Sequence, residues 1–139
     1  MALNQNNATL PKTPFSRTAV ATAAETAFQL PTNAVTLLAV ADNTDGARIT
    51  GLYAITRANP GAIQNCQLYK LVGTTYTLID SVTMANTTPS ATVANVKADF
   101  GFSTDNPLEL NEDEGLAVAI GGAVANGIVF RCQGGFYAQ

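Results

Sequence analysis

The segment QLYKLVGTTYTLIDSV (Gln67–Val82) decides the fold, because it predicts two antiparallel strands joined by a tight turn. Its centre, Gly73 followed by Thr74, fits a two-residue hairpin loop of type II′, which needs glycine at its first position. The position of this loop then fixes which residues of the two strands stand opposite each other.

The apolar residues of this hairpin do not stay on one face. In that register Tyr69 stands opposite Leu78 on one face, and Leu68 stands opposite Ile79 on the other. A hairpin with one face in water is apolar on the other face only. We therefore expect cover on both faces, with the second cover supplied by the N-terminal arm or by another subunit.

Other short apolar runs precede and follow the hairpin, separated by clusters of Gly, Pro, Asn and Asp. Residues 18–30 are ambiguous, because their alanines favour helix whereas their Thr-x-Val-x-Thr start favours a strand, which we expect. The whole pattern predicts an all-β chain of about eight strands, arranged as an antiparallel, jelly-roll-like β-sandwich.

The strand expected at residues 47–57 has apolar residues on both faces. The alternation places Ile49, Tyr53 and Ile55 on one face, and Leu52 and Ala54 on the other.

The strand expected around residues 116–121 has one face of small residues only. Ala117, Ala119 and Gly121 lie on this face, opposite the large apolar residues of the same strand. A face of this kind permits close approach of another backbone, so it is a candidate contact between subunits.

The first part of the chain predicts an extended arm over residues 1–17, followed by one sandwich domain over residues 18–139. The arm is rich in Asn, Gln and Thr, contains prolines and shows no periodicity. Two interpretations remain open: a frayed terminus, or a strap that orders only against a neighbouring subunit. Leu3, Leu10 and Phe15 would anchor such a strap.

The composition favours a protein that assembles with others. Of the 139 residues, 47% are apolar and only 12% are charged, about half the usual fraction. Such a surface is weakly protected against association. The seven basic residues are scattered, which disfavours nucleic acid and membrane surfaces as partners. The sequence also shows no transmembrane run and no signal peptide, so we expect no Sec export.

The sequence offers little material for catalysis or cofactor binding. It contains no histidine, which removes Ser-His and Cys-His nucleophiles and every histidine-ligated metal site. We expect no cofactor and no enzymatic activity; an enzyme would have to use Asp80 with Glu112 or Glu114. The acidic turn at 112–114 is expected to be solvated.

Asp80 and the two cysteines have structural interpretations. Asp80 lies either in water at an edge or bulge, or in a buried ion pair with Arg57 or Arg131. Cys66 and Cys132 fall inside predicted strands and are expected to be free thiols.

Several motifs between Ala47 and Tyr137 together resemble small structural proteins encoded near the capsid and neck genes of tailed phages. These motifs are RITGLYAI, LYKL with TLIDS, DFGFSTDNPLEL, GLAVAI and GIVFRCQGGFYA. The PLEL…GLAVAI part also resembles a strand–acidic turn–strand element of trimeric jelly rolls, in which Leu110 and Val118 would point inwards. This chain has NEDEG where such jelly rolls often have Gly-Asp.

The resemblance implies a non-enzymatic virion protein, assembled in the cytoplasm of a bacterial host, that decorates or reinforces the capsid or neck. Its expected partners are itself, as a homo-oligomer with a preference for the trimer, and the major capsid or neck protein. The alternative is a receptor- or glycan-binding tip module. The candidate interface residues are Leu3, Leu10, Phe15, Leu68, Ile79, Ala117 and Ala119.

Overall fold

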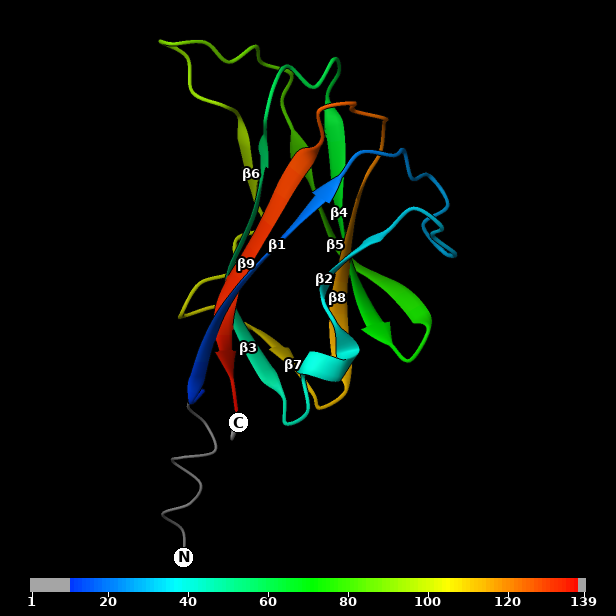
Figure 1. Ribbon diagram of the computed structural model, residues 1–139, viewed down its shortest axis with the longest axis vertical. Helices are drawn as coiled ribbons and strands as arrows, with labels where there is room; N and C mark the ends of the chain where they lie inside the picture. The colour runs from blue at the N-terminus through cyan, green and yellow to red at the C-terminus, as the bar shows by residue number, and fades with distance from the viewer. Residues whose placement is uncertain (1–10, 138–139) are drawn as a thin grey trace, which may run out of the picture.

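Two antiparallel sheets face each other in the computed structural model, which describes residues 11–137 (Figure 1). One sheet has the order β1-β9-β3-β6, with β7 also pairing β3, and the other has the order β2-β8-β4-β5. The strands are β1 (Thr13–Ala21), β2 (Val35–Leu38), β3 (Ala47–Thr56), β4 (Gln64–Val72), β5 (Thr75–Met84), β6 (Lys97–Asp99), β7 (Leu108–Leu110), β8 (Glu114–Ile120) and β9 (Ile128–Phe136), with a 3-10 turn η1 (Val40–Asp42).

The pairing of the strands defines a jelly roll. β1 pairs with β9, β2 with β8, β3 with β6, and β4 with β5, as in an antiparallel ribbon rolled up into two sheets. The predicted all-β sandwich is therefore confirmed. The described residues form nine strands because the short strand β7 adds to β3 beside β6.

The hairpin of β4 and β5 forms around the predicted turn, where Gly73 has a φ of +61°. The predicted pairing of Tyr69 with Leu78 is confirmed. Beyond it a β-bulge leaves Ile79 without a partner, and Leu68 stands opposite Asp80. The predicted Leu68–Ile79 pair is therefore wrong.

The physical reason for this bulge lies further along β5. In the bulged register Val82 pairs with Cys66, so its side chain faces the same way as that buried residue and packs against the core. If the pairing of Tyr69 with Leu78 continued without a bulge, Val82 would stand opposite Asn65 and point to the opposite face of the sheet. The bulge thus keeps the second half of β5 in the core.

A second bulge corrects the expected faces of β3. The register with β9 shifts between Ile49 and Gly51, so Ile49 faces inwards together with Leu52 and Ala54. Tyr53 and Ile55 remain half-buried on the outer side of the sheet. The expected grouping of Ile49 with Tyr53 is therefore wrong.

The core lies between the two sheets and takes large side chains from both. Leu110 and Val118 are among these side chains, and both point inwards as the resemblance implies. The other large buried members include Ile49, Leu52, Leu68, Met84, Leu116, Ile120, Ile128 and Phe130.

The first strand begins earlier than expected. β1 starts at Thr13 and pairs along its whole length with β9, so residues 13–17 belong to the sandwich and not to an arm. Phe15 is buried in its own subunit, and the centre of its ring lies 4.4 Å from the centre of the Phe136 ring. Leu3 and Leu10 lie outside the described residues.

The connection from β1 to β2 differs from the expectation for residues 18–30. β1 ends at Ala21, and residues 22–34 form a long connection instead of continuing the strand. Among the residues that the structure describes, no helix has the length and apolar character needed to cross a membrane.

Candidate assembly surface

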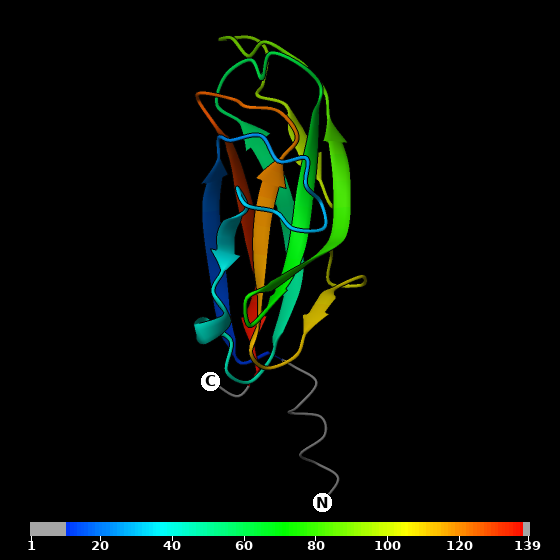
Figure 2. The same ribbon diagram turned by 90° about the vertical axis from the view of Figure 1, so that its right-hand side faces the viewer.

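The outer face of the β2-β8-β4-β5 sheet is covered, although it lies on the side away from the core. Tyr69, Ala117 and Ala119 on this face are fully buried. Figure 2 shows the β1–β2 connection, residues 22–34, crossing in front of β8 and β4. The second cover is thus a loop of the same chain, and neither the N-terminal arm nor another subunit is needed for it.

Glu25 holds this loop in place. Its backbone N–H donates to the carbonyl of Ile120, which ties the loop to β8. Its carboxylate accepts the N–H groups of Thr32 and Asn33, each at 2.7 Å. The other carboxylate oxygen accepts the N–H of Ala27 at 3.0 Å. The buried charge is therefore satisfied by the turns of the loop itself.

The same bonds set the charge state of Glu25. Burial by itself raises the pKa of this carboxyl, but the surrounding backbone N–H groups outweigh it, and the pKa is lowered from its usual value of 4.5. Glu25 is therefore ionised at neutral pH and keeps the loop closed.

Two polar side chains of β4 complete the seal between loop and sheet. The Gln67 side-chain amide donates to the carbonyl of Glu25 at 3.0 Å, and the Tyr69 hydroxyl donates to Gln67 Oε1 at 2.6 Å. Burial, and then the charge of Glu25, raise the pKa of Tyr69. This network lies over the alanines of β8.

Three of the candidate interface residues are buried within the chain itself. Ala117 and Ala119 lie under the loop, and Leu68 lies in the core between the sheets, so none of them is available to a second subunit in this structure. Ile79 differs, because its side chain remains exposed at the bulge.

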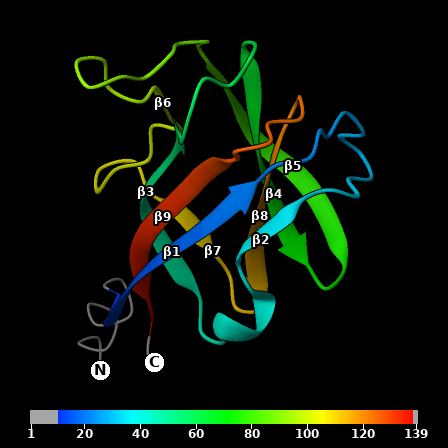
Figure 3. The same ribbon diagram turned by 45° about the horizontal axis from the view of Figure 1, so that its top comes forward.

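Next to the sealed face, several large apolar side chains are exposed. On the loop, Leu30 is 81% exposed and Phe28 is 40% exposed. A groove of about 310 Å³ separates residues 29–32 of the loop from residues 74–76 of the hairpin. Figure 3 shows this loop and β5 on the same side of the molecule. We call this region the loop–hairpin surface; its exposed apolar residues are Phe28, Leu30, Leu78 and, at the bulge, Ile79.

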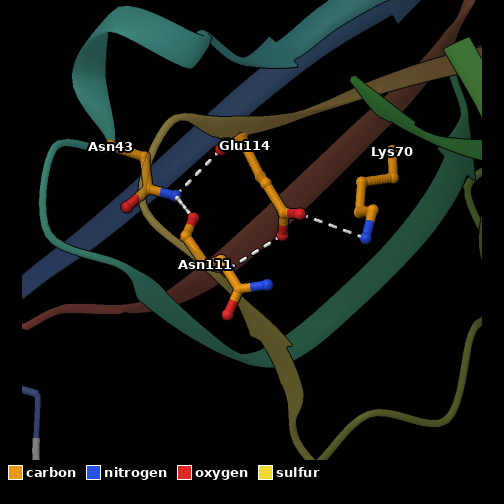
Figure 4. A network of polar contacts seen from close by, with 4 residues as sticks. All are labelled: Asn43, Lys70, Asn111 and Glu114. Atoms are coloured by element: carbon orange, nitrogen blue, oxygen red, sulfur yellow. Dashed lines mark hydrogen bonds and ion pairs between the residues drawn. The ribbon is translucent and has the colours of Figure 1, made fainter. Parts of the chain in front are cut away.

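The acidic turn before β8 is a structural element and only partly solvated. Glu112 and Asp113 are exposed, but Glu114 is buried, which corrects the expectation of a wholly solvated turn. One Glu114 oxygen accepts the N–H of Asn111 at 2.8 Å, and the other lies 3.2 Å from the Lys70 ammonium (Figure 4). Burial raises the pKa of Glu114, but these partners outweigh it and lower the pKa.

Asn43 joins the turn to the β2–β3 connection. Its side-chain amide donates to the carbonyls of Asn111 and Glu114, both at 2.8 Å (Figure 4). The backbone N–H of Asp113, which has a φ of +62°, donates to the Asn43 carbonyl. The group therefore fixes this end of the sandwich.

The carboxylates considered for catalysis are not brought together. Asp80 is half-exposed beside the bulge and accepts the N–H of Ser81 at 2.8 Å. Asp80 pairs with Leu68 of β4, which pairs in turn with Val118 of β8. Glu114 is the first residue of β8, four residues or roughly 13 Å along that strand from Val118. Paired glycosidase carboxylates stand about 5–9.5 Å apart.

A polar cleft of about 620 Å³ lies between the start of β3 and β7. Glu109 occupies it, bonded to Arg48 at 2.6 Å and to the Tyr137 hydroxyl at 2.6 Å. This hydrogen bond to Glu109 raises the pKa of Arg48. Within residues 11–137, no three metal-ligating side chains gather into a cluster.

The residues that build the cover were not found from the sequence. Glu25 is the one charged residue in the stretch TAVATAAETAFQL, which was the available signal, and Gln67 is a polar residue in the middle of an apolar strand. A polar group in such a place indicates a buried partner.

Fold and surface define a jelly-roll β-sandwich with one covered outer face and one exposed apolar side. The chain matches no family model, and no curated protein is significantly similar to it.

Proposed function

We propose that this chain is a non-enzymatic structural protein of a tailed-phage virion, which decorates or reinforces the capsid or neck as a homo-oligomer. The jelly roll supports this proposal, because viral capsid proteins use it, although lectins use it too. Since one fold serves many functions, the surface must carry the argument.

The observation that carries the proposal is the loop–hairpin surface. The residues of this surface are large, apolar and exposed in a chain that has few charges to keep it apart from others. Exposed apolar patches that adjoin one another mark interaction sites. A structural subunit requires such a surface, whereas a catalyst requires a group of reactive side chains.

A sedimentation experiment tests the proposal. The mass of the protein is measured over a range of concentrations, and the protein is then sedimented with capsids of the phage that encodes it. We expect an oligomer that co-sediments with the capsids. Leu30→Ser should weaken either the self-association or the binding to capsids. Ile63→Ser, at an exposed apolar position on the β3–β4 connection, should weaken neither. A monomer at every concentration without capsid affinity contradicts the proposal.

The glycan-binding alternative has no specific observation in its favour. Sugar sites use flat exposed rings, but Tyr69 is buried and the ring of Tyr76 packs edge-on against it. The Lys97 ammonium lies 5.1 Å from the ring centre of Tyr53, and Tyr137 is bonded to Glu109. Binding on a glycan array would favour the alternative.

A further inference from the structure

We propose that β5 is a pairing edge, to which a second copy of this chain adds its own β5 in antiparallel orientation. The two four-stranded sheets would then form one continuous sheet across a two-fold axis. This inference rests on the proposed self-association and names the surface that produces it.

The lateral edges of the two sheets differ in how well they are protected against a second strand. β1 carries Pro14, which has no N–H to donate, and the charged Arg17. β2 is only four residues long. β6 is three residues long and carries Lys97 and Asp99. Short length, proline and charge are the usual means of blocking edge pairing.

β5 has almost none of this protection. It is ten residues long, pairs only with β4 among the described strands, and contains Asp80 as its single charge. Its sequence, TYTLIDSVTM, is rich in β-branched and aromatic residues and contains no proline or glycine. Its backbone is therefore an open template for another strand.

The bulge at Ile79 limits where the second strand can pair. A bulge bends a strand and interrupts the regular ladder, so regular pairing is confined to one side of it. Residues 75–78 lie next to the loop–hairpin surface, are uncharged and are at least partly exposed. We place the contact on this side.

A two-fold axis beside Thr77 gives this segment a self-complementary register. Thr77 then stands opposite Thr77 of the second copy, and Tyr76 stands opposite Leu78. Threonine pairs stabilise antiparallel strands, and the Tyr76–Leu78 pair brings two large, mostly apolar side chains together on one face. Tyr76 also lines the groove of the loop–hairpin surface, so Leu78 of the second copy comes beside that groove.

Charge favours the same register. An axis at Asp80 would set two carboxylates directly opposite each other, which is destabilising. With the axis at Thr77, the two Asp80 side chains lie on opposite sides of it, each facing the turn of the other copy. A two-fold contact closes after two copies, so the inference favours a dimer over the trimer that the resemblance implies.

The test uses one charged variant and one control on the same strand. Thr77→Lys puts a charge at the proposed axis, whereas Thr83→Lys puts it at an exposed position beyond the bulge. We expect a two-copy mass for the wild type and for Thr83→Lys, and half that mass for Thr77→Lys. Circular dichroism checks that each variant is folded.

A cross-link gives a second readout that does not depend on weakening the contact. Residues directly opposite each other in antiparallel strands have Cβ atoms about 4.5–5.5 Å apart, which is close to the separation that a disulfide needs. Under mild oxidant Thr77→Cys should therefore form a covalent dimer, and Thr83→Cys should not. The native Cys66 and Cys132 are buried and do not compete.

The outcomes separate this inference from the proposed function. An oligomer whose mass is unchanged by Thr77→Lys, with no cross-link from Thr77→Cys, overturns the pairing at β5 but leaves assembly through another surface. A monomer that still binds capsids overturns self-pairing alone. A monomer without capsid affinity overturns both.

Discussion

At the scale of single residues, Glu25 shows how a buried charge organises a loop. An ionised carboxylate is costly to bury unless hydrogen bonds satisfy it. Three backbone N–H groups from the loop point at the Glu25 carboxylate, so the loop closes around the charge. The bonded loop in turn covers Tyr69 and the alanines of β8.

The lowered pKa of Glu25 predicts a dependence of stability on pH. Because the folded-state pKa lies below 4.5, this group contributes stability that is fully present above pH 4.5 and is lost as the pH falls through the folded value. Glu114, whose pKa is also lowered, adds to the same trend. We expect Glu25→Gln to unfold more easily at neutral pH by about 1–3 kcal/mol, with a weaker acid dependence. Urea denaturation from about pH 7 to about pH 3 measures this.

The exposed Glu112 supplies the control for that experiment. Glu112→Gln should leave the free energy of unfolding at neutral pH close to that of the wild type, because this side chain is exposed. Equal acid sensitivity of Glu25→Gln and the wild type would contradict the role given to Glu25.

A side chain at position 134 is expected to clash with the neighbouring strand. A Cβ atom on Gly134 would lie 1.9 Å from the Arg48 carbonyl oxygen, next to the bulge of β3, so backbone would have to move. We expect Gly134→Ala to cost about 3 kcal/mol or more in urea unfolding. Gly122→Ala, whose Cβ would meet only the Gln64 side chain at 3.3 Å, should cost much less. Equal costs would argue against this close approach.

At the scale of elements, the β5 bulge decides which residues of the edge strand enter the core. Ile79 is the additional residue, and Leu78 and Asp80 on either side of it keep their partners on β4. Deleting Ile79 therefore removes the bulge without changing the pairing of the remaining residues.

This predicts an outcome for the Ile79 deletion. The variant should fold with β5 in the same register, but its straighter edge should associate more readily with other strands. Light scattering against concentration measures the association. Ile79→Ser keeps the bulge and should show no increase. An unfolded deletion variant would mean that the bulge is required for the fold.

At the scale of the whole molecule, the cysteines report on the integrity of the sandwich. Cys66 lies on one sheet and Cys132 on the other, and both belong to the core between the sheets. Burial raises the pKa of Cys66 to about 12 and the pKa of Cys132 to about 11. Thiols of this kind are inert at neutral pH in the folded protein.

We therefore expect both thiols to react together with a disulfide reagent, and only as fast as the molecule opens as a whole. The reaction rate should rise with denaturant in parallel with global unfolding. Thr83→Cys provides the contrast, since a thiol at this exposed position should react at once in the native protein. Rapid reaction of one native thiol would indicate local opening of its sheet.

Much of this architecture could be predicted from the sequence. The alternating apolar runs, the turn at Gly73 and the faces of the strands over residues 116–120 and 128–132 predict an antiparallel sandwich, because side-chain direction along a strand follows residue number. The free, buried state of the cysteines follows from the same pattern.

Only the tertiary structure determined where this alternation of side-chain directions is interrupted. The bulges at Thr50 and Ile79 each insert one residue, and one residue is enough to exchange the faces of everything beyond it. The hairpin sequence shows that a second face is apolar, but residues 22–34 lie too far away in sequence for any local pattern to identify them as its cover. Their position depends on the bonds that join the Glu25 backbone to Ile120 and to the Gln67 side chain, which exist only after the sheet has formed.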